Sequence, residues 1–528
     1  MKICNQLKPK LSSGVDFISN KLLKHIAPII ITPLHYLINL SLESGYIPRE
    51  LKIAKIVPVF KDGDCHSFTN YRPISLISSF AKLLEKIVAK QLVGFLTSHN
   101  IFYKHQYGFR AKHNTSHPVL HFTDNIYNAL NQNPPAITLS IFIDLKKAFD
   151  TVDHEILLKK MEHYGVKGTS NVWFYNYLSE REQFVCLDGA KSEKQKIICG
   201  VPQGSVLGPL LFLIFINDLP NATEFLTLLF ADDTTFQYSG VDLDTLFEKC
   251  NIELEKASVW FKANKLTLNV KKTKFMLFKG KSEQINLEGL QLKIGDQLID
   301  QVGTDCKEKY FKFVGHVLDD KLAWTGHVEH ICKKLASANY AINSSKHFLP
   351  LKVRKMIYYS LFDSHLNFGN LLWGCADKKL LGKVENLQKR CVRNVALKKF
   401  TAHTEPIFKT QQILKLQDKL SFCRSIFMHQ FRNNKLPISF SNTFADIIST
   451  DILQTRHNDY NYVNLPAVKT YLEKFPYKKI ITNWNSLSID LKSTAEEIEF
   501  HQLLKEKYLS TYSCDVQCIG PCYSCDTV

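Results

Sequence analysis

The sequence contains no uninterrupted hydrophobic run that is long enough to cross a bilayer. Its most apolar run, from Pro209 to Ile216, is far shorter than the roughly 20 residues that a membrane-spanning helix requires. The first ten residues also lack the apolar core of a signal peptide. We therefore expect a protein without a transmembrane segment that is not secreted and resides inside the cell, in the nucleus, the cytoplasm or both.

Internal repeats and long low-complexity tracts are absent as well. The chain has 528 residues, of which 45% are hydrophobic and 22% are charged. These values are ordinary for a globular protein, and they exclude a mostly disordered or fibrous chain. The length suggests about three to five folded units.

Acidic residues are scarce in one part of the chain. Residues 331–440 contain 20 Lys and Arg but only 5 Asp and Glu, so this stretch carries +15 of the net charge of +17. Such a segregation favours a polyanionic partner, either nucleic acid or an anionic membrane surface. The alternative is a solvated face with surplus lysines.

Fourteen cysteines are present, and inside a cell we expect them to be reduced thiols. Ten are scattered singly, and the other four cluster at Cys514, Cys518, Cys522 and Cys525. Four thiolates can hold Zn²⁺ tetrahedrally, but the loop between these pairs is much shorter than in a standard zinc ribbon or finger. We therefore favour an unstructured reduced tail over a Zn²⁺ site.

The pattern of apolar and turn-forming residues predicts alternating helices and strands up to about residue 320. The predicted helices cover residues 15–42, with interruptions at Pro28 and Pro33, and then 79–96, 153–163, 209–219 and 242–264. The predicted strands cover residues 53–60, where Pro58 suits an edge position, 138–144 and 266–278, with a hairpin at 227–238. Beyond residue 320 we expect a mostly helical and basic chain. The predicted fold class is therefore α+β.

Three carboxylates stand at strand ends or turns. Asp144 ends an apolar strand, and Asp232 and Asp233 form the tip of the hairpin. Carboxylates beside apolar strands are costly unless a partner neutralises them, and Mg²⁺ is such a partner because it prefers oxygen ligands. The alternative for the Asp232–Asp233 pair is a solvated turn. Asp150 and Asp153 are better explained as helix N-caps.

Six short motifs follow one another along the chain. In order, they are Asn70–Leu76 (NYRPISL), Phe142–His154 (FIDLKKAFDTVDH), Gly200–Phe212 (GVPQGSVLGPLLF), Phe230–Asp233 (FADD), Leu266–Thr273 (LTLNVKKT) and Lys312–Gly315 (KFVG), the last followed by Trp324 and His327. Together they resemble the reverse transcriptases of non-LTR retrotransposons, the Jockey-like group in particular. The resemblance runs from about Ile53 to His327, and a looser similarity extends to about Tyr512.

This resemblance implies a right-hand polymerase fold with fingers, palm and thumb, followed by a mainly helical basic C-terminal region. The implied boundaries are a helical N-terminal extension at 1–50, fingers and palm at 51–320, a basic helical thumb and extension at 321–440, a C-terminal helical region at 441–513 and a Cys-rich tail at 514–528.

The resemblance also assigns roles to the acidic residues. Asp144 and Asp232 would hold two Mg²⁺ ions, with Mn²⁺ as an alternative, and Asp233 would help to position a metal or the primer end. Two such ions about 3.5–4 Å apart can clamp an in-line phosphoryl transfer. All three carboxylates are present, so the implied metal-binding set is complete.

Other matching residues would contact the incoming nucleotide. Arg72 fits the arginine of the fingers that contacts the triphosphate, with Lys55 and Lys61 as weaker candidates. Gln203 would face the nucleotide sugar, and Gly204 would let a nucleic-acid backbone approach closely. The alternatives are a surface arginine in an extended loop and an ordinary loop at the start of a helix.

Phe149 lies five residues after Asp144, where the enzymes that this sequence resembles carry a bulky aromatic residue. That ring would leave no room for a ribose 2′-hydroxyl group, and the alternative is a core aromatic residue. Lys272 matches the lysine that would protonate pyrophosphate as a general acid, although Lys271 and Lys274 lie beside it.

Residues 313–315 would form the primer grip of such an enzyme. Val314 stands there in place of the family's usual leucine, a mild change of similar apolar character.

We therefore predict an RNA-directed DNA polymerase that adds deoxynucleoside triphosphates to a DNA primer on an RNA template, with residues 331–440 gripping the duplex through its phosphates. Two alternatives are an RNA-dependent RNA polymerase and a non-catalytic RNA-binding remnant that kept the fold. We also expect the chain to lack the endonuclease domain that full-length elements of this kind carry. The oligomeric state stays open.

Overall fold

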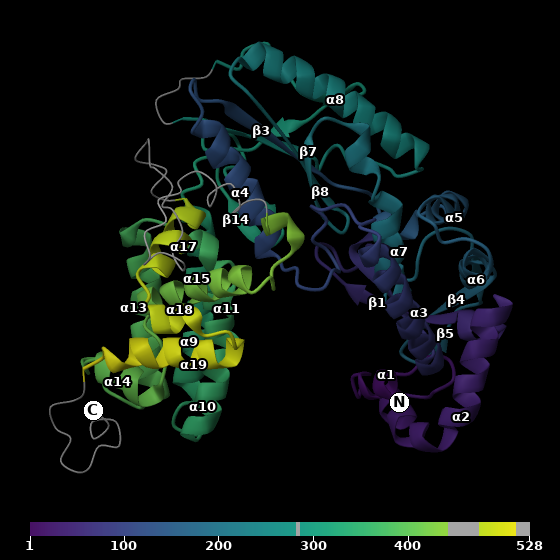
Figure 1. Cartoon of the computed structure of the whole chain (residues 1–528), viewed down its shortest axis with the longest axis horizontal. Helices are drawn as coiled ribbons and strands as arrows, with labels where there is room; N and C mark the ends of the chain where they lie inside the picture. The colour runs from purple at the N-terminus through teal and green to yellow at the C-terminus, as the bar shows by residue number, and fades with distance from the viewer. Residues whose placement is uncertain (281–285, 442–474, 514–528) are drawn as a thin grey trace.

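The computed structural model describes residues 1–280, 286–441 and 475–513. In Figure 1 the chain forms an arch. A central sheet lies at the top beneath the long helix α8 (Leu243–Ala263), the N-terminal elements form one side of the arch, and the C-terminal helices form the other. Helices and strands are mixed along the chain, which confirms the predicted α+β class.

The central sheet has five strands in the order β12-β9-β3-β8-β7. They are β3 (Ile137–Ile143), β7 (Leu226–Phe230), β8 (Asp233–Gly240), β9 (Lys274–Phe278) and β12 (Asp300–Gln301). The middle strand, β3, pairs antiparallel with both β8 and β9. Every residue of β3 is buried, because other elements cover both faces of the sheet.

The two faces of the central sheet belong to two different cores. Leu139 and Ile141 of β3 share one core with α5 (His154–His163), α7 (Leu207–Ile216) and α8. Phe142 points to the other face, where it shares a core with α4 (Ser116–Leu130). Side chains alternate between the faces of a strand, so β3 contributes to both cores. The predicted elements in this part of the chain are confirmed, except that the strand predicted at 266–278 begins only at Lys274.

A second, lateral sheet has the strand order β2-β1-β4-β5, with β6 beside β4. Its strands are β1 (Ile53–Phe60), β2 (Tyr71–Leu76), β4 (Arg181–Leu187), β5 (Ala190–Lys191) and β6 (Gln195–Ile197). β1 coincides with the predicted strand at 53–60. Its parallel pairing with β4 ends at Ile56, so Pro58 lies where β2 is the only paired neighbour of β1. That position suits a residue without an N–H group.

Four helices complete the N-terminal side: α1 (Lys2–Asn5), α2 (Asn20–Ser44), α3 (Ser79–Ser98) and α6 (Thr169–Leu178). α2 continues through Pro28 and Pro33, so the predicted interruptions are wrong. Packing against α6 and α3 holds α2, Ser19 caps its first turn, and Gly45 ends it in the left-handed conformation. By length and composition α2 could cross a bilayer, a test that core helices of soluble proteins also pass. The expected absence of a transmembrane segment therefore stays a prediction.

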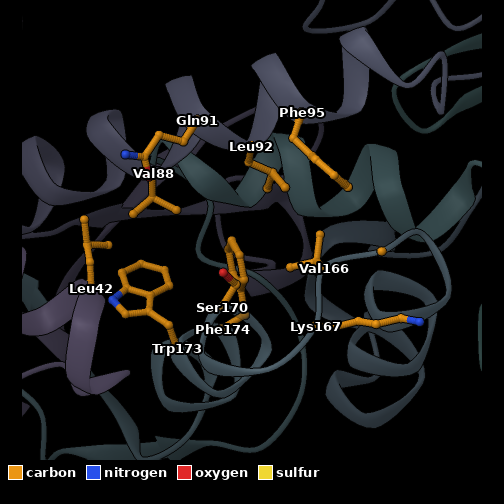
Figure 2. A pocket seen from close by; sticks show the side chains of 11 residues that line it. Leu42, Val88, Gln91, Leu92, Phe95, Val166, Lys167, Ser170, Trp173 and Phe174 are labelled. Carbon is orange, nitrogen blue, oxygen red and sulfur yellow. The ribbon is translucent and has the colours of Figure 1, made fainter.

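An apolar cavity of about 370 Å³ lies where α2, α3 and α6 meet (Figure 2). Leu42, Val88 and Phe174 line it, and the indole ring of Trp173 forms part of its wall. The Trp173 indole N–H donates a hydrogen bond of 3.2 Å to Ser41 Oγ, which ties α6 to α2. The cavity thus marks the joint between α2 and the rest of the N-terminal side.

Beyond residue 320 the described chain is helical, as predicted. The helices are α9 (Thr325–Ser345), α10 (Leu351–Ile357), α11 (Ser364–Asn367), α12 (Asn370–Trp373), α13 (Lys378–Val395), α14 (Glu405–Gln411), α15 (Leu416–Arg432), α17 (Pro476–Asn485), α18 (Ile489–Ser493) and α19 (Glu497–Ser510). A hairpin of β13 (Phe311–Phe313) and β14 (His316–Leu318) precedes α9. Trp373 and Trp484 are fully buried in a core that continues to α4, so the C-terminal helices are built directly onto the central sheet.

Shorter elements connect these parts. They are the 3-10 turns η1 (Arg49–Lys52), η2 (Phe68–Asn70), η3 (Ala148–Asp150), η4 (Leu219–Ala222) and η6 (Ile438–Phe440), the π-helical turn η5 (Tyr358–Asp363), and the two-residue strands β10 (Lys293–Ile294) and β11 (Gln297–Leu298).

One carboxyl group is buried at the junction between α4 and the C-terminal helices. Asp124 lies near Tyr107 and Tyr477, and burial raises its pKa to about 7, although a hydrogen bond with the Asn128 side chain partly opposes that rise. A raised pKa means that the folded state binds the proton more tightly than the unfolded state does. Ionisation of Asp124 therefore lowers the free energy of unfolding as the pH rises from about 4, near the ordinary pKa of an aspartate, to about 7.

Replacing Asp124 by Asn should stabilise the protein at alkaline pH, because an amide cannot ionise in the buried site. We expect the midpoint of thermal unfolding of D124N to exceed that of the parent by about a few degrees at pH 8. The difference should shrink as the pH falls toward 4. Thermal unfolding followed by circular dichroism at several pH values measures this.

The matched control is Asp242→Asn at the exposed N-cap of α8. The Asp242 carboxylate accepts hydrogen bonds from Thr245, and these hydrogen bonds lower its pKa. Ionisation of Asp242 therefore stabilises the folded state at pH 8, whereas ionisation of Asp124 destabilises it. D242N should gain nothing there. An equal gain in both variants, or a D124N gain that does not depend on pH, would contradict this account.

Candidate active site

Strand pairing brings the three predicted carboxylates to one edge of the central sheet. Ile143 of β3 lies opposite Thr234 of β8, so Asp144, the next residue, lies beside Asp233. Asp232 occupies the turn of the β7–β8 hairpin. The preceding residue of that turn, Ala231, has φ of 58°, a left-handed conformation that needs support from its surroundings.

Burial and neighbouring negative charge raise the pKa values of Asp232 and Asp233. Burial raises the pKa of Asp232, and the nearby Asp144 raises it further. Asp233 stands at the exposed rim, yet the protein around it raises its pKa to about 6, and Asp232 and Asp144 add to that rise. None of the three forms an ion pair within the described ranges. Uncompensated oxygen ligands of this kind fit a hard divalent cation such as Mg²⁺.

A tight turn holds Asp144 in place. The Asn269 side-chain amide donates to Asp144 Oδ2 at 2.7 Å, and the Asn269 backbone N–H donates to the Asp144 carbonyl at 2.8 Å. The Asp144 N–H donates to Thr273 Oγ1 at 3.3 Å. The turn occupies the first half of the strand predicted at 266–278. Asn269 and Thr273 make hydrogen bonds with Asp144 there and not with a neighbouring strand.

Lys272 lies in this same turn and is exposed, with its N–H bonded to the Asn269 carbonyl. The turn therefore carries Lys272 to the edge where Asp144 stands. Of the neighbouring lysines, Lys274 is engaged elsewhere, since its ammonium group pairs with Asp300 at 2.8 Å and with Glu308 at 3.7 Å.

The three predicted cations share one face of the lateral sheet. Arg72 lies opposite Val59 of β1, and Lys55 and Lys61 stand four residues before and two residues after Val59. Residues separated by an even number lie on the same face of a strand. Arg72 and Lys61 both act to lower the pKa of Asp232, so this face lies near the carboxylates.

The loop that carries Gln203 bridges the two sheets. The N–H of Ser75 in β2 donates to the Gln203 carbonyl at 2.7 Å, and the Gln203 side-chain amide donates to Asp150 Oδ1 at 2.9 Å. Gly204 has φ of 119°, and a Cβ atom there would lie 2.6 Å from the Ser75 carbonyl. Glycine at 204 is thus already required by contact with β2.

The two predicted N-caps had different outcomes. Asp153 caps α5, with Oδ1 accepting from the Ile156 N–H at 3.0 Å, as predicted. Asp150 does not cap a helix, because it ends the turn η3 and its side chain binds Gln203 instead. The prediction for Asp150 is therefore wrong.

Glu85 holds the loop that carries Gln203 from its other end, at the start of α7, and this role was not predicted from the sequence. Its buried carboxylate accepts hydrogen bonds from the N–H groups of Val206 at 2.5 Å and Leu207 at 3.4 Å, at the start of α7. The Tyr177 hydroxyl also donates to it at 2.8 Å. Burial raises the pKa of Glu85, and the nearby Arg181, itself buried, opposes that rise.

Phe149 packs between a buried and an exposed aromatic ring. Its ring stacks on Phe212 of α7 with centroids 4.6 Å apart, and it meets the exposed Phe109 edge-on at 6.4 Å. Its carbonyl accepts from the Val201 N–H at 2.8 Å, so the Gln203 loop and Phe149 are held together. Phe149 is only partly buried, and it is therefore not a simple core residue.

A second missed residue supports the turn that carries Asp232. The side-chain oxygen of the buried Gln106 accepts from the N–H groups of Gly108 at 2.9 Å and Ala231 at 3.1 Å. A Cβ atom at Gly108 would lie 2.3 Å from the Ala231 nitrogen, so only glycine allows this approach. The string Gln-Tyr-Gly-Phe-Arg at 106–110 was the available signal, since a glycine in a polar string indicates close backbone contact.

The segment predicted as a primer grip is the turn between β13 and β14. Val314 and Gly315 both have positive φ angles, of 45° and 83°, which closes a two-residue hairpin. Phe311 of β13 stacks on Phe142 of β3 at 4.0 Å, which attaches the hairpin to the strand that leads to Asp144. Trp324 and His327, which follow it, are core residues.

The predicted zinc ligands lie outside the described residues. Within the described ranges, one group of three possible ligands has its atoms within 4.8 Å of one another, namely the exposed and consecutive Asp64, Cys65 and His66. The active-site carboxylates are spread more widely than that group. The ten cysteines in the described ranges form no disulfide with one another.

Comparisons with known proteins agree with this geometry. Residues 60–318 match the family model described as reverse transcriptase (RNA-dependent DNA polymerase). A probable RNA-directed DNA polymerase from transposon BS of Drosophila melanogaster is 29% identical over 410 residues, which cover 73% of this chain and 43% of that protein. The RNA-directed DNA polymerase from mobile element jockey of the same fly is 26% identical over 462 residues, which cover 84% of this chain and 49% of that protein.

A more distant relative is the Pol polyprotein from the type-1 retrotransposable element R2 of Popillia japonica, 29% identical over 184 residues, which cover 34% of this chain and 25% of that protein. The chain spans less than half the length of each of these curated relatives. The family match includes Asp144, Asp232 and Asp233. Residues 60–318 therefore match the reverse transcriptase family, and over most of its length the chain is similar to polymerases of the jockey and BS elements.

Proposed function

We propose that this chain is an RNA-directed DNA polymerase that adds deoxynucleotides to the 3′-hydroxyl group of a DNA primer paired with an RNA template. The observation that carries the proposal is the convergence of two sheets on one place. Asp144, Asp232 and Asp233 stand at the edge of the central sheet, while Arg72 and Lys61 approach from the lateral sheet closely enough to act on Asp232. Primer extension by the purified protein on an RNA template tests it.

In this proposal the parts of the arch are those of a right hand. The central sheet with α4 and α8 is the palm, the lateral sheet with α3 and α6 forms the fingers, and the helices from α9 onward begin with the thumb. The proposed boundaries remain those expected from the sequence, at residues 50, 320, 440 and 513. We place the enzyme inside the cell, as its substrates require.

The carboxylates would hold two divalent cations, since enzymes of this family use ions such as Mg²⁺. When bound, the two ions supply the charge that lowers the pKa of the primer hydroxyl group and stabilises the leaving oxygen. Asp144 and Asp232 would provide ligands to these ions, and Asp233 stands beside them at the rim. The neutral contacts from Asn269 and Gln106 hold these ligands without neutralising them.

The remaining residues orient the nucleotide. Arg72, with Lys61 and Lys55 on the same sheet face, binds the triphosphate oxygens, and Lys272 donates a proton to the departing pyrophosphate. Gln203 and Gly204 form the loop beneath the sugar, with the Gln203 side chain already oriented by Asp150.

A first prediction concerns the metal ligands. Asp144→Asn and Asp232→Asn should each lower primer extension to less than about a tenth of the parental rate, because an amide is a poor ligand for a hard cation. The affinity for the primer–template should stay within about twofold, as measured by fluorescence anisotropy. The control is Asp153→Asn, which retains the cap of α5 and should extend primers normally. Substantial extension by either active-site variant would show that the ligands lie elsewhere.

A second prediction concerns the choice of sugar and separates this proposal from an RNA polymerase. Phe149 is fixed against Phe212, so a ribonucleotide would have to bury its 2′-hydroxyl group without a partner or displace the ring. Phe149→Val should therefore raise ribonucleotide incorporation by about tenfold or more, while deoxynucleotide use falls only modestly. Single-nucleotide incorporation assays with both sugars measure the ratio. A parent enzyme that already prefers ribonucleotides would refute the DNA polymerase assignment.

A third prediction concerns the grip on the duplex. A basic group lies beside the β13–β14 hairpin. It consists of Lys312, of His330, Lys333 and Lys334 on α9, and of His365 on α11. Partial burial lowers the pKa values of His330 and His365, and the neighbouring cations lower them further. Lys333 and Lys334 are exposed, and neither forms an ion pair in the part of the chain that the structure describes.

The double variant Lys333→Ala/Lys334→Ala should bind an RNA–DNA duplex several-fold more weakly on every sequence. The plot of log affinity against log salt should flatten by about one to two units, because fewer counterions are released. Lys159→Ala is the control, since Lys159 pairs with Glu155 at 2.8 Å on the exposed face of α5. A slope that the double variant leaves unchanged would mean that this face is merely solvated.

A further inference from the structure

Four aromatic side chains in the basic region (residues 331–440) are exposed, and Phe400 differs from the others in that two arginines approach its ring. The sequence pattern favours core positions over stacking platforms for aromatic residues of this region. Tyr358, Phe362 and Trp373 are indeed fully buried, whereas Tyr359, for which a core position was also expected, is 42% exposed. Phe400, in contrast, is 71% exposed. It lies between α13 and α14, in a short segment that we call the Phe400 turn (residues 397–402). An apolar ring left in water at one point of a basic surface calls for an explanation.

Two arginines of α13 approach the ring of Phe400. The guanidinium carbons of Arg390 and Arg393 lie 5.9 Å and 5.6 Å from its centroid, within the range of a cation–π interaction. Arg393 is fixed in place, because its Nε donates to the Ala402 carbonyl at 2.8 Å. Arg390 is exposed.

The Phe400 turn is held by its own backbone. The Lys398 N–H donates to the Arg393 carbonyl at 2.9 Å, and the Ala402 N–H donates to the Lys399 carbonyl at 3.0 Å. Leu397 adopts the left-handed conformation that ends α13, with φ of 54°. The exposed ring is therefore presented on a defined turn, which lowers the entropic cost of binding a ligand there.

The surroundings of Phe400 carry charge of one sign. No Asp or Glu occurs between Glu385 and Glu405. Lys389 pairs with Glu385 at 2.7 Å, whereas Arg390, Arg393, Lys398 and Lys399 form no ion pair within the described ranges. In Figure 1 α13 and α14 lie on the side of the C-terminal helices that faces away from the opening of the arch. The Phe400 turn is thus separate from the basic group on α9.

We propose that the Phe400 turn is a second nucleic-acid site, which binds single-stranded RNA by stacking an unpaired base on Phe400. Arg390, Lys398 and Lys399 would contact the flanking phosphates. Charge complementarity selects a polyanion, and a free aromatic face selects unpaired bases, since the bases of a duplex are already stacked on one another. The choice of RNA over DNA rests on the proposed function, because an enzyme that copies RNA meets its template as a single strand.

The test is a binding assay that needs no catalysis. A fluorescein-labelled twelve-residue oligouridylate is titrated with the full chain while a short blunt RNA–DNA duplex saturates the active site. Phe400→Ala and Phe400→Leu should each weaken binding about tenfold, because both remove the aromatic face, and Phe400→Trp should retain it. Phe348→Ala is the matched control, since Phe348 is 86% exposed in the same region and no arginine approaches its ring in the described structure.

Three results would overturn the proposal. They are unchanged binding by F400A and F400L, an equal loss in F348A, or an equal loss of affinity for the duplex itself. Tighter binding of single-stranded DNA than of oligouridylate would overturn the assignment to RNA. Addition of one deoxynucleotide to a primer–template whose RNA overhang is a single nucleotide should be unchanged in F400A, so a failure of the polymerase proposal and a failure of this one give different results.

Discussion

The mutual repulsion of carboxylates at the end of a buried strand is the constraint on which the rest of this structure depends. β3 is covered on both faces, and pairing with β8 brings Asp144 beside Asp232 and Asp233. Burial and proximity raise the pKa values of Asp232 and Asp233, so the folded chain bears a cost at this edge. The cost is not offset by ion pairs in the described chain. In the proposed function a bound divalent cation would relieve this cost.

Hydrogen bonds from neutral side chains, and not ion pairs, hold the segments that carry these carboxylates. Asn269 holds Asp144, and Gln106 holds the left-handed Ala231 before Asp232. Glu85 is buried beneath the start of α7 and positions the Gln203 loop by accepting hydrogen bonds from backbone N–H groups. Amide groups orient a carboxylate without cancelling its charge, so geometry and metal affinity are compatible.

Much of this arrangement was predictable from the sequence because its signals are local. The strands at 53–60 and 138–144 are apolar runs bounded by turns, and the motifs around Asp144, Asp232 and Arg72 are contiguous strings. The sequence did not reveal the supporting roles of Glu85, Gln106 and Asn269, because their hydrogen-bond partners are distant along the chain. Val206 lies 121 residues from Glu85, and Ala231 and Asp144 each lie 125 residues from Gln106 and Asn269, respectively. The predicted breaks at Pro28 and Pro33 failed because packing on α6 and α3 outweighed a local preference, and Asp150 was mistaken for a cap because its real partner is Gln203.

The net charge of the basic region overstates the positive electrostatic potential at its surface. Several of its cations are used internally: Lys419 pairs with the buried Asp363, Lys415 pairs with Glu405, and Lys355 donates to the Gln411 carbonyl. Those groups hold the C-terminal helices together and contribute little to an outer ligand. Cations without an ion pair in the described ranges remain on several surfaces, among them α9 beside the β13–β14 hairpin, the turn around Phe400 and the exposed Lys352, Lys378 and Lys379. The excess of positive charge in the sequence therefore resolves into separate local potentials, and only local potentials can select how a nucleic acid would lie on the protein.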